Sequence, residues 1–83
     1  MYIIQFTKDA DKYLDKIDKE TASKIVSTLN RIIIRPHHFV KRYEGTPFYR
    51  LRVGDYRIIL DIQNDKLIIL VIEIGHRKNI YKK

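Results

Sequence analysis

Apolar residues in the first part of the chain recur at helical spacing. Tyr2 to Phe6 reads as a short strand, and Thr7 after it can cap a helix. Asp18 can cap a second helix almost immediately after the first. The apolar positions that define the two helices are Ala10, Tyr13, Leu14 and Ile17, and then Ala22, Ile25, Val26, Leu29, Ile32 and Ile33. The short connection predicts an antiparallel helical hairpin that ends at Arg35-Pro36.

After an irregular, basic crossover at residues 36–47, the pattern changes to the alternation of strands. A two-residue turn with Gly54 first places Val53 opposite Tyr56 and Arg52 opposite Arg57. Alternation then sends one set of side chains toward the helices: Tyr49, Leu51, Val53, Tyr56, Ile58, Leu60 and Ile62. The other face of the sheet receives Arg50, Arg52, Arg57, Ile59 and Asp61.

The last strand is apolar on both sides, so its register decides its faces. A three-residue loop at residues 64–66 pairs Ile62 with Ile68 and keeps Glu73 out of the core, whereas a two-residue loop would bury Glu73. We therefore expect Ile68, Leu70, Ile72 and Ile74 on the helix side and Leu67, Ile69, Val71 and Glu73 on the arginine side. A one-residue slip would invert the strand. The apolar residues on the arginine side predict either a docking site for a partner or a surface that the crossover or tail covers.

This order of elements predicts one α+β domain over residues 1–83. It begins with a strand and a helical hairpin, and a three-stranded antiparallel meander completes a mostly antiparallel four-stranded sheet with helices on one face. With no cysteine, packing alone must hold the core. No apolar run reaches membrane-spanning length and no signal-peptide h-region is found, so we expect a cytoplasmic protein without a membrane partner.

The formal net charge of +7 is concentrated in the half that holds the strands. Residues 1–34 contain six Lys/Arg against five Asp/Glu, whereas residues 35–83 contain eleven against five. This asymmetry favours a polyanionic partner, of which nucleic acid is the commonest for a soluble protein, although a basic surface can also serve solubility alone.

The candidate chemistry is that of guanidinium groups facing a phosphate. Alternation past Gly75 puts Arg77 on the same face as Arg50, Arg52 and Arg57, and guanidinium donors match phosphate oxygens and the charge of a phosphorane-like transition state. Phe48 and Tyr81 could stack on bases, and we expect His76 and Lys78, in the same basic C-terminal stretch, to contact RNA as well. His37, His38 and His76 lack metal-ligand spacing, and no glycine-rich loop or nucleophile motif is found, so we expect no metal and no cofactor.

These residues resemble a known family. The motifs Y-R-L-R-x-G-D-Y-R at residues 49–57 and G-H-R-x-x-x-Y at residues 75–81, in a small basic chain with this element order, are similar to the RelE branch of the RelE/ParE toxin superfamily. The resemblance implies the toxin of a type II toxin–antitoxin system that a cognate antitoxin neutralises. It also implies a ribosome-dependent endoribonuclease that cuts mRNA in the A site, without a metal, by attack of the 2′-hydroxyl on the adjacent phosphate.

By this resemblance, Arg57 and Arg77 stabilise the phosphate, Arg50 and Arg52 position the RNA, and Tyr81 stacks on a base or helps transfer a proton. Relatives carry lysines where Arg50 and Arg52 stand, and arginine stays protonated, so Tyr81, His76 or a ribosomal group is left as the general base. Two alternatives stay open: a ParE-like inhibitor of DNA gyrase, and a toxin that binds RNA without cleaving it.

Overall fold

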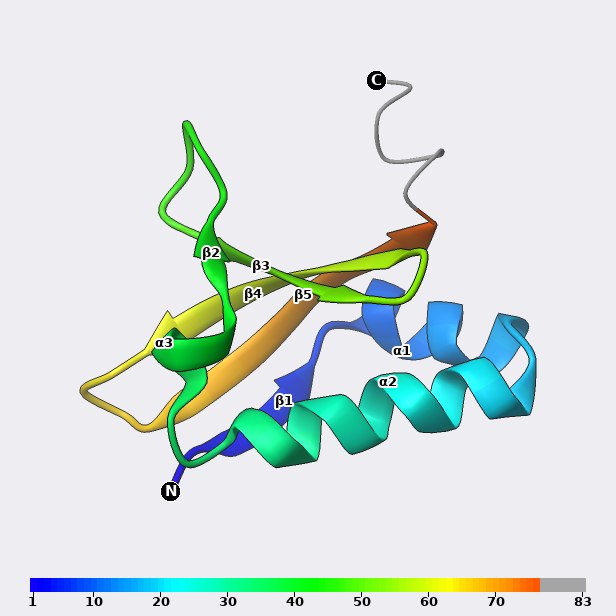
Figure 1. The fold of residues 1–83 in the computed structure, drawn as a ribbon, viewed down its shortest axis with the longest axis horizontal. Coiled ribbons are helices and arrows are strands. Elements are labelled where there is room, and N and C mark those ends of the chain that lie inside the picture. Colours follow the sequence, from blue (N-terminus) through cyan, green and yellow to red (C-terminus); the bar gives the residue numbers. More distant parts are fainter. Residues whose placement is uncertain (77–83) are drawn as a thin grey trace.

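The computed structural model describes residues 1–76, in which two long helices pack against one side of a curved sheet (Figure 1). In chain order the elements are β1 (Ile3–Phe6), α1 (Lys8–Lys16), α2 (Lys19–Ile32), α3 (Pro36–Phe39), β2 (Lys41–Arg42), β3 (Tyr49–Val53), β4 (Tyr56–Gln63) and β5 (Ile68–His76). The helices begin where the sequence predicts. The Thr7 hydroxyl accepts a hydrogen bond from the Ala10 N–H, and the Asp18 carboxylate accepts one from the Thr21 N–H.

The sheet has the strand order β1-β5-β4-β3-β2. β1 pairs with β5 in parallel, and the other neighbouring strands are antiparallel. The predicted α+β fold is confirmed, but the sheet has five strands where the sequence predicted four. The additional strand, β2, is two residues long and lies in the crossover, which also contains the single turn of α3. Two residues give no readable alternation, so the sequence pattern did not reveal β2.

The core lies between the helical hairpin and the sheet. Ala10 from α1 and Ile25, Leu29 and Ile32 from α2 are buried against it. From the sheet, Leu51, Ile58, Leu60, Ile62, Ile69, Val71 and Ile74 complete the cluster. Over residues 1–76, no helix is both long enough and apolar enough to cross a membrane.

The predicted pairing of β5 with β4 is wrong, and the predicted faces are wrong in the first half of the strand and right for Glu73 and Ile74 at its end. Ile62 pairs with Ile69 and Leu60 with Val71, so Ile69 and Val71 are buried under the helices. The register then shifts, because Ile59 pairs with Glu73 and leaves Ile72 as the extra residue of a β-bulge. The bulge returns Glu73 to the arginine side and Ile74 to the core. The first half of β5 therefore has its faces reversed relative to the prediction, and Glu73 still stays out of the core.

This correction also removes the predicted apolar docking strip. Ile69 and Val71 belong to the core, and Leu67 lies in the β4–β5 loop with a positive φ of 56°. Ile59 is on the side opposite the helices yet is only 3% exposed, between Arg50 on β3 and Glu73 on β5. The arginine side therefore carries no continuous strip of the four residues Ile59, Leu67, Ile69 and Val71.

Thr7 holds the bulge in place, and this role gives a first testable prediction. Its hydroxyl accepts from Ala10 and donates to the Ile72 carbonyl over 2.8 Å. We expect Thr7→Ala to lower the free energy of unfolding by about 2 kcal/mol, because it removes a helix cap and leaves a part-buried carbonyl unpaired. Urea denaturation measures this. Thr28→Ala is the control, since that hydroxyl only bonds back to the Lys24 carbonyl of its own helix. An equal effect of both variants would contradict the role of Thr7.

Candidate functional site

The side of the sheet opposite α1 and α2 carries the arginines, and we call it the arginine face. Arg52 pairs directly with Arg57, and Arg50 pairs with Ile59, as the Gly54 turn predicts. Gly54 has a positive φ of 59°, which a glycine at the first central position of a two-residue hairpin adopts without strain. The predicted convergence of Arg50, Arg52 and Arg57 on one face is therefore confirmed.

A groove of about 450 Å³ lies on this face beside the short edge strand β2. Its lining combines two of the predicted arginines with four residues of the β2 hairpin: Lys41, Arg42, Tyr43, Glu44, Arg50 and Arg57. Lys41 pairs with Arg50 across the strands, so a cation of β2 continues the row of cations on β3 and β4. Three cations of the arginine face, Lys41, Arg50 and Arg57, line the groove with one glutamate and form a site suited to an anionic ligand.

An edge-on ring pair and a cation–π contact hold α3 and β2 against the sheet. The His37 ring meets the Tyr49 ring edge-on with centroids 5.1 Å apart, and the Arg42 guanidinium lies 5.5 Å from the centre of the Tyr49 ring. His37 Nε2 and the Tyr2 hydroxyl each lie 2.8 Å from Asn64 Oδ1, which makes His37 Nε2 a donor if the amide oxygen is the acceptor for both. The groove wall is thus anchored to β3, to the β4–β5 loop and to the N-terminus.

The loop between β2 and β3 is a defined turn. The Thr46 N–H donates to the Tyr43 carbonyl over 3.1 Å, and Gly45 has a φ of 81°, as the third position of a type II turn requires. The Thr46 hydroxyl donates to the same carbonyl and accepts from the Phe48 N–H. Glu44, the second residue of the turn, therefore has a fixed backbone at the rim of the groove.

Phe48 and His76, both predicted to contact RNA, lie at the margins of this site. Phe48 precedes β3, is half-buried, and accepts the Tyr43 N–H through its carbonyl. His76 pairs with Tyr56, on the strand face that packs toward α1, and its ring lies edge-on to Tyr56 at 5.3 Å. The His76 ring therefore belongs to an aromatic cluster beside α1, and its RNA contact stays a prediction.

The third member of that cluster is Tyr13, whose ring lies 6.4 Å from the ring of Tyr56. Burial raises the pKa of the Tyr13 phenol, and a backbone hydrogen bond from His76 opposes this increase. A raised pKa keeps this phenol protonated at neutral pH. Its hydroxyl therefore serves the packing of α1 against the end of β5.

The predicted residues Arg77, Lys78 and Tyr81 lie outside the described residues. Their assigned roles stay predictions. In the other direction, sequence reasoning did not identify Lys41 and Glu44 as groove residues, because it treated residues 36–47 as an irregular crossover. The sequence did contain a signal for this hairpin. Gly45 lies between the basic dipeptide Lys41-Arg42 and the strand that begins at Tyr49, and a glycine at such a position is compatible with a hairpin turn.

The pairing of Arg52 with Arg57 gives a second prediction. Like charges on directly opposed strand residues repel, so we expect Arg52→Gln to raise the free energy of unfolding by about 0.2 to 1 kcal/mol at low salt. The gain should shrink at high salt as the repulsion is screened. Urea denaturation of Arg52→Gln, Arg57→Gln and the double variant tests this, because repulsion requires the second substitution to add little to the first. Strict additivity would contradict direct coupling of the two guanidinium groups.

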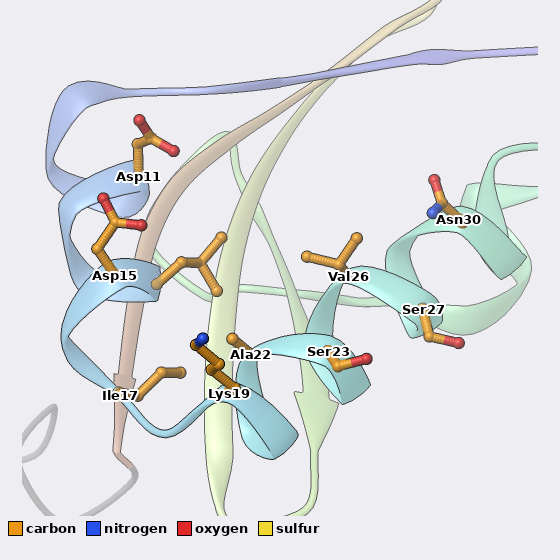
Figure 2. Close-up of a pocket in the computed structure, with 10 residues that line it drawn as sticks. Asp11, Asp15, Ile17, Lys19, Ala22, Ser23, Val26, Ser27 and Asn30 are labelled. Carbon is orange, nitrogen blue, oxygen red and sulfur yellow. The ribbon is translucent and has the colours of Figure 1, made fainter.

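A second hollow lies on the helical layer, away from the arginines. Figure 2 shows Asp11, Asp15 and Ile17 of the α1 side facing Lys19, Ala22, Val26 and neighbouring polar residues of α2 across this hollow. Its volume is about 730 Å³. The two aspartates and the apolar floor give it a chemistry unlike that of the arginine groove, and they do not suit an anionic ligand.

Comparison with known proteins agrees with this fold. The RelB–RelE toxin–antitoxin complex of Escherichia coli contains a chain that superposes with a TM-score of 0.80 at 20% identity, over 92% of this chain and 96% of that one. The archaeal RelE–RelB complex of Pyrococcus horikoshii matches with a TM-score of 0.78 at 25% identity, over 92% and 94% of the two chains. A Methanocaldococcus jannaschii protein that bears the toxin name RelE4 is 26% identical across the whole of this chain and 94% of its own length.

A small α+β protein with a helical hairpin on one face of the sheet and a basic groove on the other is therefore of the RelE-like class. The model of the ParE toxin family of type II toxin–antitoxin systems matches residues 4–81. The chain belongs to this family, within the RelE/ParE superfamily, and the superposed structures and the curated relative bear RelE names. The predicted resemblance is confirmed.

Proposed function

We propose that this toxin is a metal-independent endoribonuclease that cleaves mRNA in the ribosomal A site and so stops translation. The observation that carries the proposal is the groove that Arg50 and Arg57 line together with Lys41 on the face of the sheet opposite α1 and α2. In the proposed reaction the 2′-hydroxyl oxygen attacks the adjacent phosphorus. The bond to the 5′-oxygen breaks, leaving a 2′,3′-cyclic phosphate and a 5′-hydroxyl.

Each arginine has a defined part in this proposal. Arg57, on the central part of the face, donates hydrogen bonds to the phosphate and is best placed to stabilise its additional negative charge in the transition state. Arg50 binds the neighbouring backbone in the groove, and Arg52, which is exposed beside Arg57, steers the RNA toward it. Arg77 and Tyr81 would supply a second guanidinium and a stacking or proton-transferring phenol.

A cognate antitoxin is the second proposed partner. The support is that the similar structures from E. coli, P. horikoshii and Mycobacterium tuberculosis are complexes of RelE-type toxins with their antitoxins. An antitoxin for this chain would need to neutralise or cover its basic face, so we expect an acidic-tending protein. Co-expression with the reading frames adjacent to this gene, followed by purification of the complex, tests this partner.

The enzymatic proposal is tested by supplying the purified protein to ribosomes programmed with a defined mRNA and mapping the new 5′ ends. We expect cleavage only on the ribosome, a terminal 2′,3′-cyclic phosphate, and no loss of activity in EDTA concentrations that leave the ribosomes intact. RNA binding that weakens with salt but never leads to cleavage would instead indicate a non-catalytic toxin.

Inhibition of DNA gyrase is the second candidate function, because the matching family model is that of ParE toxins. It predicts inhibited supercoiling by gyrase and no cleavage of mRNA on ribosomes. A supercoiling assay with the same protein preparation distinguishes the two functions.

A further inference from the structure

The arginines leave the proposed reaction without a proton acceptor. The 2′-hydroxyl must lose its proton as it attacks, and a guanidinium group cannot accept one at neutral pH. Lysine and tyrosine side chains ordinarily carry their protons at neutral pH as well, whereas a glutamate ordinarily does not. Among the lining residues that lie within the described positions 1–76, only the glutamate is therefore ready to accept a proton without a change in its usual ionisation.

From the groove we infer that Glu44 is the general base of the cleavage reaction, an inference that rests on the proposed function. Glu44 lines the groove together with Arg50 and Arg57, the two residues proposed to hold the phosphate. A phosphate bound there would bring the 2′-hydroxyl of the adjacent ribose into the space that Glu44 borders.

The β2–β3 turn fixes the backbone of Glu44 at the rim of the groove. The turn is closed by the Thr46 N–H and hydroxyl, which both donate to the Tyr43 carbonyl, over 3.1 Å and 2.7 Å. The next hairpin bond joins the Tyr43 N–H to the Phe48 carbonyl over 3.0 Å. A backbone held in this way fixes the point from which the Glu44 side chain reaches into the groove, which favours a productive geometry.

The proton and bond changes balance without a metal or cofactor. The 2′-hydroxyl proton passes to the Glu44 carboxylate while the new oxygen–phosphorus bond forms. The bond from phosphorus to the 5′-oxygen then breaks, and that oxygen takes a proton from water. Glu44 returns its proton to solvent after the products leave.

The test separates chemistry from binding in Glu44→Gln, using single-turnover cleavage on programmed ribosomes. We expect the cleavage rate at saturating ribosomes to fall by about 10²-fold or more, the usual contribution of a general base. Affinity for the programmed ribosome should stay equal or become tighter, because a negative charge has left a cationic groove. Glu44→Asp should retain part of the rate. Glu20→Gln, on the exposed first turn of α2, is the matched control and should cleave like the unmodified protein.

The dependence of the cleavage rate on pH distinguishes a general base from a residue that only supports the structure. The rate of the unmodified protein should fall as the pH is lowered, and Glu44→Gln should lose this acidic limb. Cleavage by Glu44→Gln within about threefold of the unmodified rate would overturn the assignment while leaving the proposed function intact, since a general base contributes far more. Loss of chemistry in Lys41→Met with full activity in Glu44→Gln would also overturn it. If the unmodified protein does not cleave at all, the proposed function itself has failed.

Discussion

Replacement of Arg57 by alanine is expected to slow ribosome-dependent mRNA cleavage by about 10²- to 10³-fold, the effect of removing one donor to transition-state charge. Arg57 and Arg50 both line the groove on the side of the sheet opposite the helices. The Arg57 guanidinium is therefore the group that we propose to contact the bound phosphate and the charge that develops on it. Single-turnover cleavage of a defined mRNA on ribosomes measures the effect, and growth arrest on expression should be lost in parallel.

Two control variants make this result specific. Arg57→Lys keeps the charge but loses the planar pair of donors, so we expect an intermediate rate. Lys16→Ala removes one positive charge from the last turn of α1, on the helical layer, and should leave cleavage unchanged. Equal toxicity of Arg57→Ala and the unmodified protein, with both folded, would contradict the assignment of the arginine face.

Substitution of Leu60 by alanine is expected to lower the free energy of unfolding by about 3 kcal/mol, because it opens a cavity in a closely packed core. Leu60 has no exposed surface and pairs with Val71 beside the β-bulge, under the helical hairpin. A domain of this size has a total stability of about 4 to 12 kcal/mol, so the variant should be partly unfolded at 37 °C. Urea denaturation followed by circular dichroism measures the loss.

Val26→Ala is the matched control for the core prediction. Val26 lies on α2 but is 38% exposed at the hollow of the helical layer, and its truncation should cost less than about 1 kcal/mol. A similar loss in both variants would show that burial against the sheet does not determine the effect. Loss of cleavage by Leu60→Ala should follow its unfolded fraction, whereas Arg57→Ala should lose cleavage while folded.

The β3–β4 hairpin shows how much local chemistry can determine. Gly54 accepts the positive φ of the turn, and once the turn length is fixed each side chain of both strands has one possible face. The positions of Arg50, Arg52 and Arg57 could therefore be predicted correctly from the sequence. The two helix caps, Thr7 and Asp18, are local features of the same kind, since each bonds to a backbone N–H three residues away.

The register of β5 shows where local reasoning fails. Both faces of this strand are apolar, so alternation gave no preference, and the loop length was inferred from the need to keep Glu73 out of the core. The structure meets that need by a bulge at Ile72, which depends on a hydrogen bond from Thr7, 65 positions earlier in the chain. No pattern within the strand could have indicated this bond.

The sequence by itself thus determined the fold class, the helix starts, the hairpin register and the shared face of the three described arginines, because these follow from contacts between residues close in the chain. Only the tertiary structure decided the faces of Ile69 and Val71, the fifth strand β2, and the presence of Lys41 and Glu44 in the arginine groove. Each of these depends on which distant segments pack together. The burial of apolar surface drives that packing, and it leaves little trace in local periodicity.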